Sequence, residues 1–337
     1  ITVKVFFSKE IPYPYNTVSR YVLDILKDYS RVSGNKVRIE RVDPDDERFE
    51  KLASIYGIPP VQVNTIEASQ IKIKKVFLGL GFVSEDRIET IPVITDVSDL
   101  EYRITSTIKK LLSDKKKTVA FLKGHETFQC NLLKEALREQ YEVKDIDLKT
   151  EDLKGVDVLV IAGPKEKLKD EELLALDQFI LKGGRVLFLV QRIQGDLQFG
   201  FARQLDTGIE ELLKRYGIEI PPKVVYDASA GMVNVSERRG GFIFTTVVPY
   251  PFFPKIVNLN RDHIVTKDVE ALTLGYTSPI KDRTGKDLQF IYLARTTARS
   301  GLLGKPLYVA FNRTFPPGAF SGPPETVAAL VAGRFRT

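Results

Sequence analysis

The chain has 337 residues, which at roughly 100 to 200 residues per domain predicts two or three domains. Its 43% hydrophobic and 28% charged residues match soluble globular proteins and exclude disordered and fibrous classes. The net charge of +6 is a small excess of 50 basic over 44 acidic residues, and the basic residues form only short clusters. We therefore expect no nucleic-acid partner.

Residues 1–114 alternate between strand and helix patterns. Period-two apolar residues predict strands at 2–7, 36–42, 61–63, 71–83 and 88–94, the last two as a hairpin. Apolar residues at helical spacing predict helices at 18–29, at 44–56 with a proline in the first turn, and at 98–112 with a capping box. This order resembles a thioredoxin-like domain.

Two segments bear on that interpretation. Residues 57–61, which read Gly-Ile-Pro-Pro-Val, resemble the loop in which the thioredoxin fold places a cis-proline before its third strand. Where a thioredoxin carries its Cys-x-x-Cys pair, residues 8–12 read Ser-Lys-Glu-Ile-Pro. Because thiol–disulfide exchange needs a thiolate, we expect the fold without redox chemistry.

After a polar break at 114–117, a second α/β pattern occupies residues 115–337. Continuous apolar runs predict buried strands at 119–122, 156–162 and 186–190. Helical patterns are present at 128–137, 173–180 and from 201 to 216. Continuous apolar strands joined by helices predict a parallel sheet covered on both faces, a doubly wound αβα domain that resembles the flavodoxin-like sheet of class I amidotransferases. Beyond 226 we expect an irregular lobe with short strands.

The best polar candidate for a binding site is His125. It follows Gly124 in the loop after the strand at 119–122, at the carboxyl edge where open α/β folds place ligands. Gly163 and Pro164 end the next strand, so the candidate ligand contacts are Gly124, His125, Gly163 and Pro164. The alternative for His125 is a surface or packing role. The second histidine, His263, has no partner in the pattern, and no zinc motif is present.

The sequence contains no motif of a catalytic nucleophile and no phosphate-binding loop. The single cysteine, Cys130, lies inside the predicted helix at 128–137 and not in an amidotransferase elbow, which favours a packing role. Gly183 and Gly184 fit a helix end, because the spacing of phosphate-binding loops is missing. We therefore expect no catalytic residue, no cofactor and no metal; the remaining enzyme hypothesis is a hydrolase that uses His125 and Glu126.

An aromatic and proline-rich segment at 249–254 is the other candidate contact. Tyr250, Phe252 and Phe253 alternate with prolines, which expose aromatic residues at little entropic cost. A loop that plugs the domain boundary is the alternative interpretation.

No run of about 20 apolar residues and no signal peptide is present. The chain opens directly on a predicted strand and ends just after the apolar run 327–332. We expect an excised fragment whose flanking segments, such as membrane spans, lie outside this sequence.

Several segments in order resemble the GldG-type, gliding-motility-associated auxiliary family of ABC transporters. They are residues 1–12, 15–30, 36–45, 74–82, 96–111, 121–126, 216–218 and 224–227. The resemblance implies a protein anchored to the cell membrane by segments absent here, with its soluble part periplasmic, working with an ABC permease and ATPase. It carries over no catalytic residue. Gliding motility or envelope export is the implied process, and a solute-binding module of the same transporter is the alternative.

Overall fold

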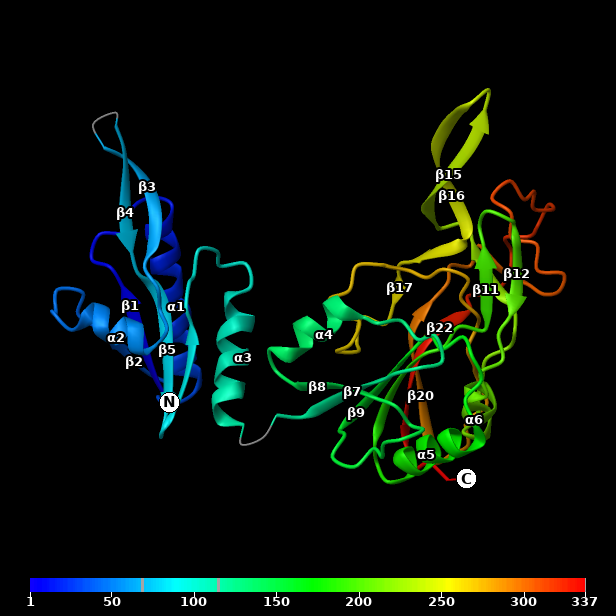
Figure 1. Ribbon diagram of the computed structural model, residues 1–337, viewed down its shortest axis with the longest axis horizontal. Helices are drawn as coiled ribbons and strands as arrows, with labels where there is room; N and C mark the ends of the chain where they lie inside the picture. The colour runs from blue at the N-terminus through cyan, green and yellow to red at the C-terminus, as the bar shows by residue number, and fades with distance from the viewer. Residues whose placement is uncertain (68–69, 114–115, 337) are drawn as a thin grey trace. The chain divides into compact units, whose positions relative to one another are not determined.

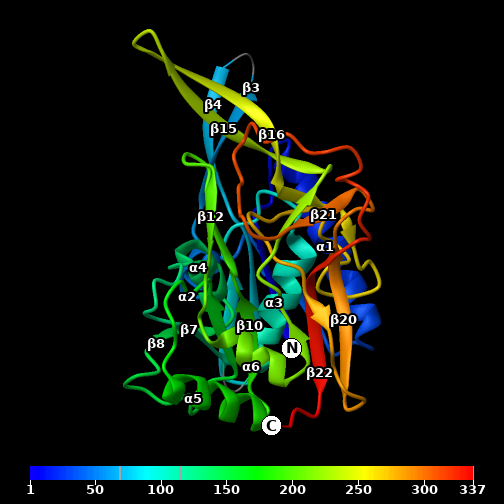
Figure 2. The ribbon, with the colours of Figure 1, turned by 90° about the vertical axis from the view of Figure 1, so that its right-hand side faces the viewer.

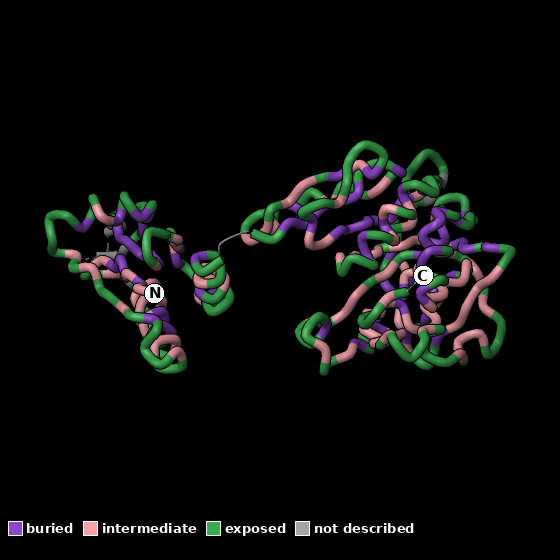
Figure 3. The backbone as a smooth tube through the Cα atoms, turned by 90° about the horizontal axis from the view of Figure 1, so that it is seen from below, coloured by how far each residue is buried: buried purple, intermediate pink, exposed green. Residues whose placement is uncertain are grey.

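The computed structural model describes residues 1–67, 70–113 and 116–336 (Figure 1). The chain divides into two compact units, an N-terminal unit, Ile1–Lys116, and a C-terminal unit, Lys117–Thr337. Both mix helices with several sheets, and in each unit the buried segments gather in the interior (Figure 3).

The N-terminal unit is built on a four-stranded sheet in the order β2-β1-β5-β6. Its elements are β1 (Thr2–Phe7), α1 (Tyr15–Val32), β2 (Arg38–Arg41), α2 (Phe49–Ile55), β3 (Val61–Glu67), β4 (Gln70–Val76), β5 (Leu78–Ser84), β6 (Arg87–Ile91) and α3 (Leu100–Leu112). β1 runs parallel to β2 and antiparallel to β5, which forms a hairpin with β6. β3 and β4 pair only with each other.

Strand alternation assigns the helices of this unit to two faces. Val5 and Phe7 of β1 pack with residues of α1 and α3, whereas Phe6 between them packs with α2. β5 carries Gly81 on the α2 face, where an added Cβ would lie 2.3 Å from Cδ1 of Tyr56. The glycine therefore lets the end of α2 lie directly on the sheet.

Two expected element boundaries in this unit are corrected. The predicted strand at 71–83 is two strands, because Phe77 leaves the ladder: its N–H donates to Oγ of Ser8 at 2.8 Å. α2 starts at Phe49, since Asp43 and Asp46 hold turns by accepting backbone N–H bonds.

The capping box expected at 98–101 and the cis-proline expected within 57–61 are also not found there. Asp99, without a side-chain cap, precedes α3, while Asp96 accepts the N–H of Ser98 at 3.1 Å. Within the described ranges the cis peptide bonds precede Pro14 and Pro306, so the bonds before Pro59 and Pro60 are trans.

The C-terminal unit opens with a four-stranded parallel sheet in the order β10-β9-β7-β8. Its first elements are β7 (Thr118–Leu122), α4 (Asn131–Arg138), β8 (Glu142–Ile146), β9 (Val158–Ala162), α5 (Asp170–Leu181), β10 (Arg185–Leu189) and, further on, α6 (Ile209–Arg215). Val119 and Phe121 face α4, and Ala120 and Leu122 face α5 and α6. Helices thus cover both faces, as expected for a doubly wound sheet.

The rest of this unit is a set of small, mostly antiparallel sheets. Its strands are β11 (Ile193–Asp196), β12 (Phe201–Gln204), β13 (Ile218–Glu219), β14 (Val224–Asp227), β15 (Ala230–Arg239), β16 (Phe242–Ile256), β17 (Asn258–Leu259), β18 (Leu272–Thr273), β19 (Lys281–Asp282), β20 (Leu288–Arg295), β21 (Ser300–Leu303) and β22 (Thr326–Gly333). β15 and β16 form a long hairpin that projects from the unit (Figure 2).

Three expectations for this unit are wrong. Residues 201–204 form β12, paired with β11, and not the start of a helix. Cys130 precedes α4 with φ of 50° and is not inside the helix, because the N–H of Phe128 bonds to the carbonyl of Ala162 at 2.9 Å. The segment 249–254 lies within β16, and Tyr250 and Phe252 are each only 1% exposed.

Candidate binding site at the carboxyl edge of the parallel sheet

A buried histidine–carboxylate pair lies at the carboxyl edge of β7. Nε2 of His125 is 2.9 Å from Oε1 of Glu172, and the two side chains are 4% and 2% exposed. Oε2 of Glu172 accepts the N–H of Lys169, 2.7 Å away, at the start of α5. Both carboxylate oxygens are therefore used, and the imidazole is held in one orientation.

The loop that presents His125 has an unusual backbone. Gly124, His125 and Glu126 have successive φ values of 91°, 51° and 52°, a left-handed run that side chains adopt rarely. The carbonyl of His125 accepts the N–H of Lys165 at 2.9 Å, which ties the loop after β7 to the loop after β9. The strain is thus held by contacts between the two loops.

Gly163 and Pro164, at the end of β9, are buried. A Cβ on Gly163, whose φ is 56°, would lie 2.7 Å from the Phe128 ring, so glycine is required for this approach. The structure therefore brings the four predicted residues to one edge of the sheet, where His125, Gly163 and Pro164 are buried and only Gly124 is exposed.

A second buried ion pair follows β10. Nη1 of Arg192 donates to the carbonyl of Leu205 at 3.0 Å and to Glu210, which also accepts the Oγ1–H of Thr207 at 2.7 Å. The carbonyl of Thr207 in turn accepts the N–H of Leu168, 3.0 Å away. These bonds link the loops after β9 and β10 to the start of α6.

The exposed Asp206 beside this pair is electrostatically perturbed. Hydrogen bonding with the Glu210 carboxyl is the main cause that holds the pKa of Asp206 below its usual range. The N–H of Gly208 and the charges of Lys167 and Arg192 act in the same direction, and burial opposes them.

The geometry at this edge favours a structural role, in which hydrogen bonds hold the loops together, over proton transfer. The ring of His125 is enclosed against Glu172, whereas the side chain of Glu126 is 59% exposed and lies 3.9 Å from Nζ of Lys165. His125 and Glu126, adjacent in sequence, therefore do not form an acid–base pair. Across the described part of the chain, no three His, Cys, Asp or Glu side chains gather as a metal site.

The aromatic candidates belong to a different region. Tyr250 and Phe252 are core residues of the β-rich part, with Phe253 packed beside them, and the Tyr250 hydroxyl donates to the carbonyl of Val309. Sequence reasoning missed Glu172, Arg192 and Glu210. The only signal for them was the acidic start of α5 and an arginine two residues after the apolar run that ends at Val190.

The N-terminal unit has an open cleft of about 910 Å³ beside residues 8–9, which directly follow β1. Its lining residues are Ser8, Lys9, Pro44, Asp45, Asp46, Glu47, Phe49, Glu50, Ser54, Gly57, Ile58, Pro59, Pro60, Lys75 and Phe77. Lys9 and Asp45 are 2.6 Å apart across it, and this hydrogen bond raises the pKa of Lys9. The lining includes neither histidine nor cysteine.

The fold and site together describe a two-unit α/β protein whose buried polar groups link loops to one another. Among the described residues, no helix has the length and apolar character needed to cross a membrane.

Residues 116–337 match the family described as "ABC-type uncharacterized transport system", and residues 1–82 match a domain of unknown function. The chain belongs to this auxiliary family of ABC-type transport systems.

The chain is also similar to an uncharacterized protein of Borreliella burgdorferi, with 26% identity over 313 residues. This alignment covers 87% of the chain and 59% of the relative, so the chain spans less than two thirds of the length of the relative.

Two solved structures resemble parts of the chain. The "mmIFT52 N-terminal domain" has a TM-score of 0.38 at 20% identity, covering 57% of this chain and 76% of its own. A putative GMP synthase protein from Thermoplasma acidophilum has a TM-score of 0.31 at 14% identity, covering 59% and 84%. Both scores are below 0.5, so neither likeness establishes the fold or a function.

Proposed function

We propose that the chain is a non-catalytic accessory and scaffolding component of an ABC-type transport system. The observation that carries the proposal is the family match over residues 116–337. In this proposal the chain lies outside the cytoplasm, on the periplasmic side, and is anchored to the cell membrane by segments beyond this sequence. It binds the permease and ATPase subunits and supports gliding motility or envelope export, as the GldG-type resemblance implies.

The topology supports the domain assignments that accompany this proposal. The order β2-β1-β5-β6, with helices on both faces, fits a thioredoxin-like domain, and the parallel sheet β10-β9-β7-β8 fits an amidotransferase-like αβα domain.

An apolar surface on the parallel sheet supports a partner-binding role. Leu187 and Leu189 of the edge strand β10 are each 47% exposed. Leu187 pairs with Val160, which packs on the α4 face, so both leucines lie on this face beyond the reach of the helix. Exposed apolar residues on a sheet face are typical of protein interfaces.

The test is crosslinking and affinity purification of the full-length, membrane-anchored protein from its native cells, followed by mass spectrometry. We expect an ABC permease and its ATPase, and we expect the double variant Leu187→Asp with Leu189→Asp to recover much less of both. Leu174→Asp is the matched control, since Leu174 on α5 is 56% exposed on the opposite face. Recovery of neither subunit by the wild-type protein contradicts the proposal.

A solute-binding module of the same transporter is the second candidate, favoured by the 910 Å³ cleft lined by Lys9, Asp45 and Lys75. Native mass spectrometry of the purified chain distinguishes the two. A single small molecule that is retained by the wild-type chain and lost in Ser54→Trp, which fills the cleft, supports solute binding. If the wild-type chain retains no small molecule, the result favours the scaffolding function.

A further inference from the structure

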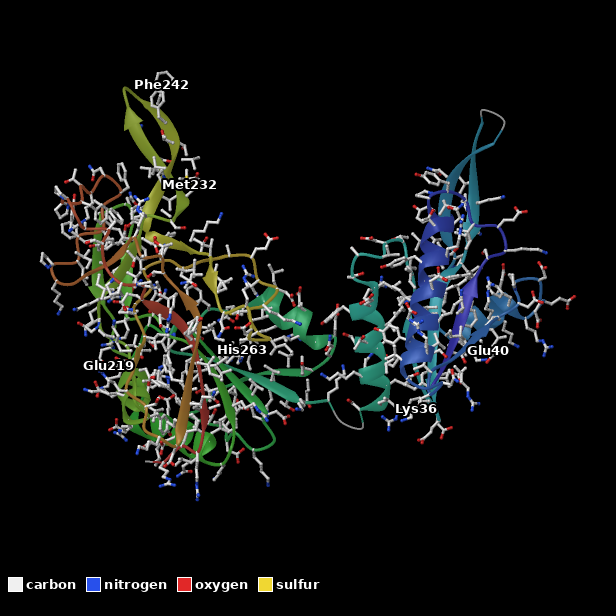
Figure 4. All side chains as sticks on the ribbon, turned by 180° about the vertical axis from the view of Figure 1, so that it is seen from behind. Lys36, Glu40, Glu219, Met232, Phe242 and His263 are labelled. Carbon is white, nitrogen blue, oxygen red and sulfur yellow. The ribbon has the colours of Figure 1, made fainter. Side chains whose placement is uncertain are left out.

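The β15–β16 hairpin is a long two-stranded ribbon with an open end. Its strands pair from 231 with 250 to 239 with 242, and the turn is formed by Gly240 and Gly241, with φ of 58° and 87°. Its base is fixed by Val233 and Tyr250, which are 8% and 1% exposed. Its free end projects away from the C-terminal unit, with Phe242 at the tip (Figure 4).

Three successive large apolar side chains occupy this free end. Phe242, Ile243 and Phe244 are 72%, 73% and 55% exposed. Because alternate residues of a strand point to opposite faces, the two phenylalanines lie on one face of the ribbon and Ile243 on the other. Exposing such a cluster to water is unfavourable, which indicates that a binding partner covers this surface.

The opposite strand of the tip carries charge. Arg238 pairs with Ile243 and Arg239 with Phe242, while Glu237 pairs with Phe244, so residues 237–244 have a net charge of +2 − 1 = +1. The next cross-strand pair is polar: Oγ of Ser236 and Oγ1 of Thr245 are 2.9 Å apart. This polar pair separates the apolar cluster at the tip, which lies on the strand opposite Arg238, from Val247 and Met232, which are exposed further along the ribbon.

We propose that this tip, residues 238–244, binds the surface of an anionic lipid bilayer. Lipid surrounds both faces of a ribbon at once, whereas a protein groove usually covers one. The phenylalanines and Ile243 enter the boundary between headgroups and acyl chains, and Arg238 pairs with a lipid phosphate.

The backbone limits the depth of this insertion. On the other side of β16, the described structure places a strand only at 255–256, where β18 pairs. The outer N–H and C=O groups of 242–248 need hydrogen-bond partners, which hydrocarbon lacks and the headgroup region supplies. This contact requires no transporter subunit, so it extends the proposed function without depending on it.

The chain contains no tryptophan, which makes a direct test possible. Phe242→Trp places one fluorophore at the tip, and Phe199→Trp, where phenylalanine is also 72% exposed, is the control. With vesicles of phosphatidylglycerol and phosphatidylethanolamine in equal parts, we expect a blue shift and quenching by brominated acyl chains for Phe242→Trp only.

Co-sedimentation measures the contribution of each side chain. Ile243→Asp should weaken vesicle binding of the otherwise wild-type chain by at least about tenfold, since one buried Ile contributes that much. Ile264→Asp, where isoleucine is 78% exposed elsewhere, should have no effect. Arg238→Gln should weaken binding about fivefold and reduce its salt dependence.

Three results with vesicles overturn the proposal. They are the lack of a blue shift on anionic vesicles, equal binding of the wild type and Ile243→Asp, and equal binding to anionic and neutral phosphatidylcholine vesicles. A photoreactive residue at position 242 of the membrane-anchored protein that captures a protein instead of lipid also overturns it, in favour of strand addition to the edge of β16. None of these results affects recovery of the permease.

Discussion

The two units differ in where they keep polar side chains. Where the structure describes burial, the N-terminal unit buries only apolar residues and glycines. Every buried polar or charged residue lies in the C-terminal unit: Thr118, His125, Lys134, Glu172, Arg192, Thr207, Glu210, Asp227, Thr266, Ser278, Thr296, Ser300 and Glu325. The first unit is therefore held by its apolar core, and the second also depends on internal hydrogen bonds.

The architecture explains the difference. One four-stranded sheet and three helices satisfy most backbone groups of the N-terminal unit within regular elements. The small sheets of the C-terminal unit leave loops whose N–H groups need other partners, and buried side chains supply them. Asp227 accepts the N–H groups of Ser229 and Thr297, and Oγ1 of Thr296 accepts the N–H of Glu325.

The largest effect is expected at the buried ion pair of the C-terminal unit. Glu210→Ala leaves Arg192, which is 8% exposed, without its counter-charge, and should lower the free energy of unfolding by about 3–5 kcal/mol. Urea unfolding followed by circular dichroism measures the loss, and hydrogen exchange assigns it to residues 190–215. The double variant Arg192→Met with Glu210→Leu should recover most of the stability. If Glu210→Ala lowers the free energy of unfolding by less than about 1 kcal/mol, the C-terminal unit does not depend on this buried ion pair.

A smaller effect is expected from a neutral substitution at Asp227, which is fully buried. Its carboxylate accepts three hydrogen bonds, and the amide of Asp227→Asn turns a donor toward donors such as the N–H of Thr297. The expected loss is about 2 kcal/mol. Thermal unfolding compared with Asp268→Asn, whose native side chain is 86% exposed, measures it. Equal melting temperatures would show that these bonds stabilise little.

Alkaline pH should weaken the C-terminal unit through its buried tyrosines. Burial raises the pKa of Tyr216, Tyr250 and Tyr276 in the folded state, and Asp177 adds to the effect at Tyr216. Unfolded tyrosines lose their proton near about pH 10, so above that pH the native state binds more protons and stability falls as pH rises. Tyr216→Phe should reduce this slope by up to about 1.4 kcal/mol per pH unit, measured by urea unfolding across the alkaline range. If Tyr216→Phe leaves the pH dependence of the unfolding free energy unchanged, Tyr216 does not cause the loss of stability at alkaline pH.

The sequence predicted elements with local patterns and missed contacts between distant residues. β7, β9 and β10 were found because buried parallel strands are continuous apolar runs, whereas the edge strand β8, Glu142–Ile146, has too many polar residues for that pattern. His125 was placed correctly at the sheet edge. Its partner Glu172 is 47 residues away, and no periodicity links the two.

The smallest effect is expected at an exposed ion pair of the N-terminal unit. Nζ of Lys27 and Oδ1 of Asp24 are 2.8 Å apart on α1, with both side chains 70% exposed. Water and salt screen such pairs, so Asp24→Asn should change the free energy of unfolding by less than about 0.5 kcal/mol. Urea unfolding at low and high salt measures the change. A loss comparable to that of Asp227→Asn would mean that charge also holds the N-terminal unit together, and the contrast between an apolar and a polar interior would no longer explain the stability of the two units.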